Sequence, residues 1–479
     1  QLPSLFSVAK SAKPGIKIAC FTDWTGINQL VEPNTVDFFR FANAGPPERS
    51  SIIVSDLITV IENHQPELVF IHFDDIDEAG HEFGWGSEQQ YEAISLVDTE
   101  IGMLLEAYDK VGILNDTLVL VIADHGGQTE GHGFTNQKNI DIPWIAKGPG
   151  VSQNYVISSY VRNMDTPATA MHALGIEQPK LWMGRPITEI YNQEPYQSPP
   201  GPNNRLTGTV ISLVISGLNS AGMDTAFTPI MDSLISKGSY AQHARGQMPS
   251  TSLTNIASIL MGSGPEETGV CQGPFPDANS CEWNGVDDSL VPPISGAGAL
   301  FPSIFQVLAN NNIYDTDAVF RSQNISKLIA PSNISQSIES SDSDVISTII
   351  SKLSQTPIPP SFIFGQLDNL QSIGKNYGYD SPKYIAEITN IDHLLESLVE
   401  ALPTNTILII TSDNGGIGTE NGNLDNTSII LPFIVYGPGV IKQNYRIPTH
   451  TRNMDSAAIA LYSLGYQQPV YWVADSHTD

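Results

Sequence analysis

The chain has 479 residues, of which 41% are hydrophobic, and its formal net charge is −29 at pH 7. A surface this acidic repels phosphate backbones, which excludes nucleic acid as a bulk partner. It remains compatible with a small phosphate ester held by metal ions, because the ions supply positive charge locally. The longest apolar runs, such as TLVLVIA and TILIIT, fall far short of the roughly 20 residues that cross a bilayer, so we expect no membrane span.

Cysteines and glycosylation motifs give little information about the compartment. The three cysteines, Cys20, Cys271 and Cys281, do not make a disulfide framework, although a bridge between the last two would close a loop. Four N-x-S/T sequons are about the number expected by chance in a chain rich in Asn, Ser and Thr. With the acidic composition, they fit an extracellular, secretory-pathway or periplasmic location.

The first elements in chain order predict an α/β fold. ELVFIHF at 67–73 and TLVLVIA at 117–123 are apolar, β-branched runs typical of buried parallel strands. The stretch between them has apolar residues at helical spacing, and Ser87 with Gln90 would form the capping box of that helix. Strand, helix, strand implies a right-handed crossover and a parallel sheet. IPWIAKG at 142–148 is interpreted as the next strand.

Long segments of the sequence occur twice. VRNMDTPATAMHALG at 161–175 returns as TRNMDSAAIALYSLG at 451–465, and ADHGGQTEGHG at 123–133 returns as SDNGGIGTENG at 412–422. The period is close to 290 residues, which is far above solenoid periods. We interpret the chain as containing a duplicated domain.

The two copies are unequal in length. Residues 1–198 match roughly 300–479, whereas 205–300 have no counterpart in the first copy, and TVISLVISG within them predicts a first strand. We therefore expect 1–198 to be the C-terminal half of a domain and 206–479 a whole domain. The linker, 199–205, ends a stretch rich in Pro, Gly, Asn and Gln.

Acidic and histidine side chains follow two strands of the first copy. Asp77 and His81 come after the strand that ends at His72, and Asp124 and His125 come directly after the next strand. His132 follows on a glycine-rich turn. Because the C-terminal ends of parallel strands meet at one edge of a sheet, we expect these side chains to converge.

Imidazole nitrogens and carboxylate oxygens form a zinc-type ligand set, and two neighbouring ions would clamp an in-line displacement at phosphorus. The alternative is that these residues are ordinary loop groups that satisfy their own hydrogen bonds. His72 is interpreted as structural, and Asp74 and Asp75 as loop carboxylates that would at most orient the ligands.

The chain resembles the alkaline phosphatase superfamily, and most closely the type I phosphodiesterases and nucleotide pyrophosphatases with their bacterial alkaline-phosphatase-like relatives. The motifs that carry the resemblance are FTDWTGINQLVEP, DEAGHEFGWGS, ADHGGQTEGHG and IPWIAKGPGV. The resemblance implies a mostly parallel sheet with helices on both faces, two Zn²⁺ ions, and a Thr or Ser nucleophile that forms a covalent intermediate.

By the same resemblance, one ion would be held by Asp77, His81 and His132. The other would be held by Asp124 and His125, together with an Asp from the first strand and the nucleophile. Those last two groups belong to the part that the first copy lacks.

In the second copy, the segment QMPSTSLTNIASILMG resembles the nucleophile segment of the family. It would put Ser252 at the nucleophile position and Asn255 where an Asn contacts phosphate oxygen, and a helix N-terminus suits an anion. The alternative is that Ser252 is an N-cap. The metal ligands are mostly replaced, which predicts a pseudoenzyme domain without catalytic zinc. The degenerate positions are Ser216, Gln371, Lys375, Asn414 and Asn421, and only Asp413 is kept.

These observations favour a metal-dependent hydrolase of phosphoric esters that acts on a small phosphate ester. This reading expects the chain to be a fragment, with a further segment that supplies the missing Asp and nucleophile. Three alternatives stay open: a residual hydrolase that uses only the three-ligand set, a non-catalytic scaffold that binds an anion or a partner, and docking of residues 205–300 onto the first copy. The choice among monoester, diester, pyrophosphate and sulfate ester stays open, as does the oligomeric state.

Overall fold

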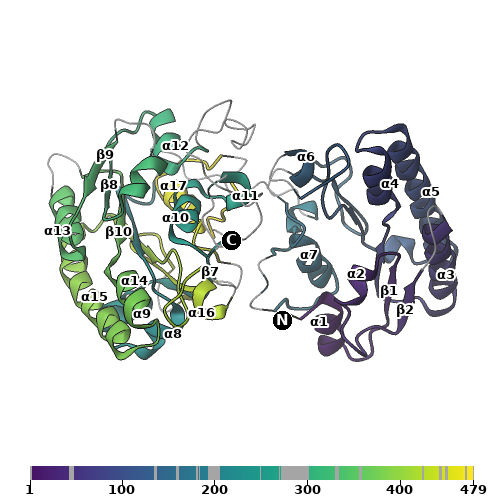
Figure 1. Cartoon of the computed structure of the whole chain (residues 1–479), viewed down its shortest axis with the longest axis horizontal. Coiled ribbons are helices and arrows are strands. Elements are labelled where there is room, and N and C mark those ends of the chain that lie inside the picture. Colours follow the sequence, from purple (N-terminus) through teal and green to yellow (C-terminus); the bar gives the residue numbers. More distant parts are fainter. Residues whose placement is uncertain are drawn as a thin grey trace. The chain divides into compact units, whose positions relative to one another are not determined.

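The computed structural model divides into two compact units (Figure 1). Unit 1 comprises Gln1–Ile157 and Val161–Glu194, and unit 2 comprises Ser158–Tyr160 and Pro195–Asp479. The predicted linker (apart from Arg205) and the Cys271–Cys281 pair lie outside the described residues. The structure describes residues 3–42, 48–133, 137–157, 161–179, 182, 184–191, 205–248, 250–268, 270, 301–329, 334–354, 359–422, 425–441, 445–447, 451–469 and 472–477.

Unit 1 contains two small sheets. β1 (Ile18–Thr22) lies between β2 (Phe38–Phe41) and β3 (Leu68–His72), and both neighbours run parallel to it. β4 (Val119–Ile122) pairs antiparallel with β5 (Trp144–Lys147) in a sheet of its own. The predicted strands are present, but the expectation that β3 and β4 share one parallel sheet is wrong for the described residues. The physical reason is that no strand among the described residues of unit 1 lies between them to bridge their ladders.

Helices cover the three-stranded sheet of unit 1. α3 (Glu48–His64) packs on β1 and on α5 (Glu88–Lys110). Ser87 caps α5, because its Oγ accepts from Gln90 N at 3.2 Å. The Gln90 side chain in turn accepts from Gly86 N, one residue earlier than a standard capping box requires. The other helical segments of unit 1 are α1 (Leu5–Ala12), α2 (Thr25–Asn28), α4 (Asp75–Phe83), η1 (Leu114–Asp116), α6 (Gln137–Ile140), α7 (Asp165–Ala173) and η2 (Thr188–Ile190).

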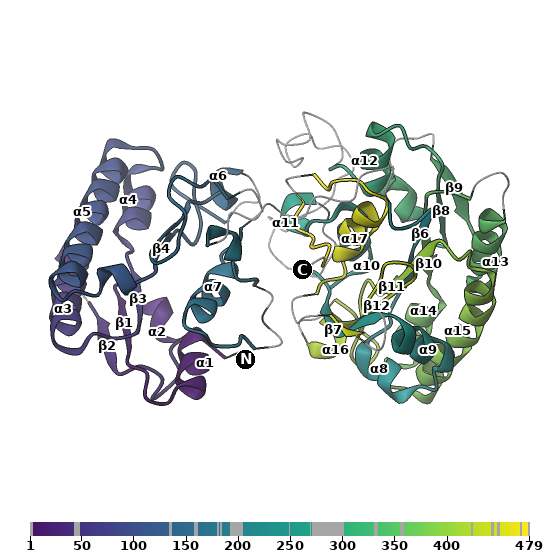
Figure 2. The same ribbon diagram turned by 180° about the vertical axis from the view of Figure 1, so that it is seen from behind.

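Unit 2 is built around an eight-stranded sheet in the order β13-β7-β12-β11-β6-β10-β8-β9 (Figure 2). The five strands from β11 to β9 run parallel to one another, and β12 is antiparallel to both of its neighbours. The strands are β6 (Thr209–Ile215), β7 (Ser239–Arg245), β8 (Thr316–Phe320), β9 (Ser335–Ile338), β10 (Phe362–Leu367), β11 (Thr406–Thr411), β12 (Ile430–Tyr436) and β13 (Tyr445–Arg446).

The central strand β6 explains why unit 2 has helices on both faces. All seven of its residues are buried, and alternate side chains enter different hydrophobic clusters. Val210 and Val214 pack with α10, α12 and α17, whereas Ile211 and Leu213 pack with α9, α13 and α15. The helical segments are α8 (Ser220–Thr225), α9 (Pro229–Lys237), α10 (Ser252–Met261), α11 (Pro265–Thr268), α12 (Ile304–Asn310), η4 (Gln323–Leu328), α13 (Asp342–Leu353), α14 (Asn369–Tyr377), α15 (Pro382–Ala401), α16 (Asn426–Ile429) and α17 (Asp455–Ser463).

The mostly parallel α/β architecture confirms the predicted fold class. The order α1, β1, β3, α4, α5, β4, β5, α7 of unit 1 matches the order α12, β8, β10, α14, α15, β11, β12, α17 of unit 2. The elements from β6 to α11 precede α12 in unit 2, and nothing described before α1 corresponds to them. No helix among the described residues is both long and apolar enough to cross a membrane.

Candidate functional site

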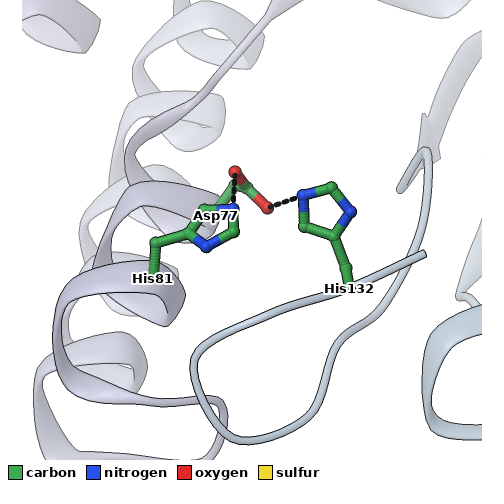
Figure 3. Close-up of side chains that lie close together, drawn as sticks. All are labelled: Asp77, His81 and His132. Carbon is green, nitrogen blue, oxygen red and sulfur yellow. Dashed lines mark ion pairs between the residues drawn. The ribbon is translucent and has the colours of Figure 1, made fainter. Parts of the chain in front are cut away.

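Three predicted ligands of unit 1 lie together at the C-terminal end of β3. Asp77 and His81 are four residues apart on α4 and therefore share one helix face, with His81 Nε2 3.4 Å from Asp77 Oδ2. His132 comes from the loop after β4, and its Nε2 lies 3.9 Å from Asp77 Oδ1. Figure 3 shows the Asp77 carboxylate between the two imidazole rings. One ligand atom from each residue lies within 4.8 Å of the others.

The loop that carries His132 is fastened to α4 by backbone contacts. Trp85 N, just after the helix, donates to Thr129 O at 2.7 Å, and Gln128 and Gly131 exchange two backbone hydrogen bonds across a tight turn. His81 Nδ1 lies 2.9 Å from Glu130 O, so the ring must carry its proton on Nδ1. In the neutral tautomer that this contact favours, Nε2 of His81 carries the lone pair and faces Asp77, as a metal ligand requires.

One oxygen of the Asp77 carboxylate lacks a hydrogen-bond donor in the described part of the chain. Its Oδ1 atom is buried and makes no hydrogen bond among the described residues. A buried carboxylate oxygen without a donor is costly, and a cation at this point would satisfy it. The indole of Trp85 lies 5.1 Å from the His81 ring and 6.0 Å from the His132 ring, so the cluster has an aromatic wall. One carboxylate and two imidazoles fit a zinc ion.

Asp124 and His125 lie beside this cluster but do not join it. The His125 ring stacks on His132 at 3.9 Å between centroids, and its Nδ1 lies 2.9 Å from Gly126 O. Its Nε2 is 3.4 Å from Asp124 Oδ2, on a side chain that is 67% exposed. Within the described part of the chain, these two residues find no third ligand at metal-binding distance.

A buried arginine holds the carboxylates that precede Asp77. Arg49 Nε lies 2.8 Å from Asp75 Oδ1, and its guanidinium also pairs with Asp74, Glu78 and Asp23. Burial raises the pKa of Asp74, and the charge of Arg49 opposes that rise. Sequence reasoning missed Arg49, because no motif surrounds it.

His72 lies outside the three-residue cluster. Its Nδ1 is 3.3 Å from Asp23 Oδ1, so the partner of His72 is a carboxylate at the end of β1. Sequence reasoning missed Asp23 as well, although its place in FTDWT directly after a strand was a usable signal. These contacts agree with a structural role for His72, whereas Asp75, predicted in a loop, is the first residue of α4, and Asp74 is the N-cap residue of that helix.

In unit 2, the corresponding positions form a network of neutral side chains. Ser252 Oγ donates to Gln371 Oε1 at 2.7 Å, and Asn421 Nδ2 donates to the same oxygen at 3.1 Å. The Asn414 amide lies 2.9 Å from the Ser252 hydroxyl and 3.1 Å from Gln371 Oε1. The side chains that stand where ligands were expected therefore bond to one another.

Among the predicted ligand positions of unit 2, Asp413 is the one that holds an acidic residue. It is fully buried, and Ser216 Oγ donates to its Oδ2 at 2.9 Å while Gly217 N donates to Oδ1. Burial raises the pKa of Asp413 to about 6, and the Ser216 hydrogen bond limits the rise. Lys375 is exposed and lies outside the hydrogen-bonded network, because a flexible ammonium group stays in water.

Two expectations for the second copy need correction. The N-cap of α10 is Thr251, so the reading of Ser252 as an N-cap is wrong. Asn255 is fully buried, its Oδ1 accepts from Gln247 N and Asn453 Nδ2, and its amide donates to backbone carbonyls. These bonds tie Asn255 to the loop before α10, so its amide is not presented to a phosphate.

Comparisons with known proteins agree with this architecture. The sequence model of the family described as type I phosphodiesterase / nucleotide pyrophosphatase matches residues 22–166 and 210–434. Ectonucleotide pyrophosphatase/phosphodiesterase family member 3 of Mus musculus is 29% identical over 113 residues, which are 23% of this chain and 13% of that protein. GPI ethanolamine phosphate transferase 1 of Saccharomyces cerevisiae is 29% identical over 145 residues, covering 26% of this chain and 16% of its own length.

Solved structures of similar proteins were also found. Murine ectonucleotide pyrophosphatase/phosphodiesterase 5 in complex with AMP has a TM-score of 0.44 at 13% identity, covering 55% of this chain and 96% of that one. A putative sulfatase from Bacteroides thetaiotaomicron has a TM-score of 0.44 at 14% identity, covering 56% and 73%.

The match of the family model decides the classification. The chain spans less than a fifth of the length of either curated relative above, so their whole activities do not transfer to it. The family model, in contrast, covers well over half of this chain in two segments. The chain therefore belongs to the type I phosphodiesterase / nucleotide pyrophosphatase family of the alkaline phosphatase superfamily.

Proposed function

We propose that this protein is a metal-dependent hydrolase of phosphoric esters whose metal centre lies in unit 1. The observation that carries the proposal is the buried Oδ1 of Asp77, which accepts no hydrogen bond among the described residues, next to the Nε2 atoms of two imidazoles. Family membership supports the reaction class. The substrate is a small phosphate ester.

Zinc is the metal that this donor set fits. Asp77, His81 and His132 would hold one ion, and Asp124 with His125 would hold a second. When bound, zinc supplies a Lewis acid for a phosphoryl oxygen. It would also give local positive charge to a chain whose net charge is −29, which an anionic ester would otherwise avoid.

Other residues of unit 1 prepare the site. The carbonyls of Glu130 and Gly126 hold the protons of His81 and His125 on Nδ1, so each Nε2 is free to bind. Trp85 keeps water from one side of the cluster. Arg49 neutralises the carboxylates next to Asp77, which lowers their repulsion of an incoming phosphate.

We propose further that unit 2 is a pseudoenzyme domain and that the chain arose by duplication, with residues 1–198 and 206–479 as the unequal copies joined by 199–205. The neutral network around Gln371 supports this reading, because amides bind zinc poorly and these amides already satisfy one another. An extracellular, secretory-pathway or periplasmic location fits relatives whose names carry "ectonucleotide" and "extracellular".

One observation favours a second candidate function, a non-catalytic scaffold that binds an anion or a partner. Asp124 and His125 have no third ligand among the described residues, so the two-ion site is incomplete in unit 1 as it stands. A scaffold needs neither ion. The two functions differ in whether the purified chain holds zinc.

The first test is zinc content by elemental analysis of the full chain. We expect about one ion per chain, or two if the Asp124 and His125 position also fills. The variant His81→Ala should lose the first ion, whereas the matched variant Lys375→Ala at the corresponding position of unit 2 should keep it. Phosphodiester and phosphomonoester hydrolysis is then measured on the same preparations. A chain without zinc would place the scaffold function ahead of the hydrolase.

A further inference from the structure

We propose that Asn421 of unit 2 is a site of spontaneous deamidation, and that the carboxylate it forms disrupts the neutral network around Gln371. In this reaction the backbone nitrogen of the next residue gives up its proton and bonds to Cγ of the asparagine. The bond from Cγ to Nδ2 breaks, and Nδ2 leaves as ammonia. Water, the one co-reactant, then opens the cyclic succinimide to aspartate or isoaspartate.

Both amides that stand in place of histidines in unit 2 are followed by glycine. The pairs are Asn414–Gly415 and Asn421–Gly422, and unit 1 has His125–Gly126 and His132–Gly133 at the same places. A glycine after asparagine favours ring closure, because no side chain hinders attack by its backbone nitrogen. A third pair, Asn284–Gly285, lies outside the described residues.

The fold requires these glycines. Gly133 has a φ of 88° and Gly422 a φ of 87°, a left-handed conformation that residues with a side chain rarely adopt. A Cβ added at Gly126 would lie 2.1 Å from a backbone oxygen of a nearby segment, and one added at Gly415 would lie 2.0 Å from another. An amide at either histidine position therefore stands before a glycine that the loop cannot replace.

The structure protects the first pair. Asn414 is fully buried, and its amide lies 2.9 Å from Ser252 Oγ and 3.1 Å from Gln371 Oε1. The nitrogen that would attack, Gly415 N, donates to Ser428 O at 2.9 Å. Deamidation of Asn414 therefore requires several hydrogen bonds of the buried network to open at once.

The second pair is held less firmly. Asn421 is partly exposed, and its side chain makes one hydrogen bond among the described residues, from Nδ2 to Gln371 Oε1 at 3.1 Å. Gly422 forms an isolated β-bridge with Ser250, but within the described chain its own N donates no hydrogen bond. Loss of one side-chain hydrogen bond is enough to free this amide, so a small local opening exposes it to attack.

Deamidation would replace a donor by an anion at the centre of the network. Gln371 Oε1 accepts from Ser252 Oγ at 2.7 Å and from Asn421 Nδ2 at 3.1 Å. A carboxylate at 421 would turn an oxygen toward that acceptor. Gln371 and the neighbouring acid Asp413 are buried, so water screens the new charge poorly. The modified unit 2 should therefore be less stable than the original.

Peptide mapping by mass spectrometry tests the site on the full, unmodified chain. During incubation under native, mildly alkaline conditions, amide should convert to acid at least about tenfold faster at Asn421 than at Asn414. The rate at Asn421 should rise with pH, because the attacking nitrogen must lose its proton. In concentrated urea the two sites should react at similar rates, which makes Asn414 the internal control.

Two outcomes of this experiment overturn the proposal. Equal rates at the two sites in the folded chain would show that the fold does not select Asn421. Faster conversion at Asn414 would show that the buried pair is the more open one.

The variant Asn421→Asp tests the consequence of the modification. Its urea midpoint for unit 2 should fall below that of the unmodified chain. The matched variant Asn421→Gln keeps a neutral amide and would have to close a larger ring, so its peptide should stay unmodified. Urea unfolding of the original chain before and after incubation gives the same comparison if the Asp variant does not fold. A midpoint unchanged by both routes would refute the effect on the network.

The site is independent of the proposed metal centre, because the reaction uses residues of unit 2 and water alone. The rate at Asn421 should be the same in the His81→Ala variant. Deamidation in a chain without zinc would leave this site standing and remove the hydrolase. Zinc in a chain whose Asn421 stays intact would do the reverse.

Discussion

Unit 1 and unit 2 place matching loops after matching strands, but the two loops contribute to different polar sites. One site contains a carboxylate and histidines, and the other contains mainly amides. In unit 1, the loop after β4 brings His132 to a buried carboxylate oxygen that has no donor. In unit 2, the same loop brings Asn421 to Gln371, whose Oε1 accepts from the neutral side chains of Ser252 and Asn421. The comparison teaches that a buried polar site is stable either with a cation or with amides, but the two solutions need different side chains.

The sheets of the two units also differ. Unit 2 has the complete sheet and the neutral site, whereas unit 1 has the charged site and a sheet that is split into two parts. Among the described residues, the eight-stranded sheet and the candidate ligand cluster therefore lie in different units. Each prediction below tests one side of this comparison.

The largest expected effect comes from truncating the same isoleucine in each unit. Ile434→Ala should lower the free energy of unfolding of unit 2 by about 2–5 kcal/mol, because it leaves a cavity in a closed core. Ile145→Ala should change the stability of unit 1 by less than about 0.5 kcal/mol, because Ile145 is 58% exposed. Urea unfolding of the two variants measures both costs. Equal costs would show that unit 1 is covered at this point.

The next largest effect is the pH dependence of stability that Asp413 gives to unit 2. The pKa of Asp413 is about 6 in the folded chain, against 3.8 as the ordinary value, so the folded state binds more protons between these values. Stability should therefore fall as pH rises from about 4 to about 6, by roughly 3 kcal/mol for this group.

The variant Asp413→Asn should remove this part of the pH dependence. The measurement is the urea midpoint of unit 2 from pH 4 to pH 7 for both proteins, and the difference between them isolates the one carboxyl. A difference that does not change with pH would mean that the pKa of Asp413 is the same in the folded and the unfolded chain.

The smallest expected effect comes from the N-cap serines of α5 and α15, which should stabilise the two units equally. Ser87 caps α5 and Ser381 caps α15, each accepting from the backbone N three residues on at 3.2 Å. Either serine changed to alanine should cost about 1 kcal/mol in its own unit. Thermal unfolding of the two variants provides the measurement. Clearly unequal costs would show that the split sheet of unit 1 has loosened α5 as well.

The sequence predicted the strands and the meeting of Asp77, His81 and His132 for physical reasons, whereas Asp124 and His125, expected at the same point, stay outside that cluster. β3, β4 and β6 are continuous apolar runs, and Ser87 with Gln90 marks the start of α5. Asp77 and His132 meet because α4 follows β3 and the glycine-rich loop follows β4, although those strands turned out to lie in different sheets. Whether these residues bind zinc stays a prediction.

Other features could not be predicted, because they depend on contacts between residues distant in sequence. Arg49 reaches carboxylates 26 and 29 positions further along, without any local pattern. Asn255 has the residue type of a phosphate ligand but is bonded to the loop around Gln247. Residue type and spacing indicate which chemistry is available, and the packing decides which partner each group finds.

Trp85 gives unit 1 an optical property of its own. Its indole lies within about 6 Å of both His81 and His132, and the corresponding residue of unit 2 is Tyr379. Indole fluorescence responds to positive charge nearby, so filling or protonation of this cluster should alter the emission of Trp85. The chain therefore carries an intrinsic reporter of the cluster of Asp77, His81 and His132, at a position where the second unit has the phenol ring of Tyr379.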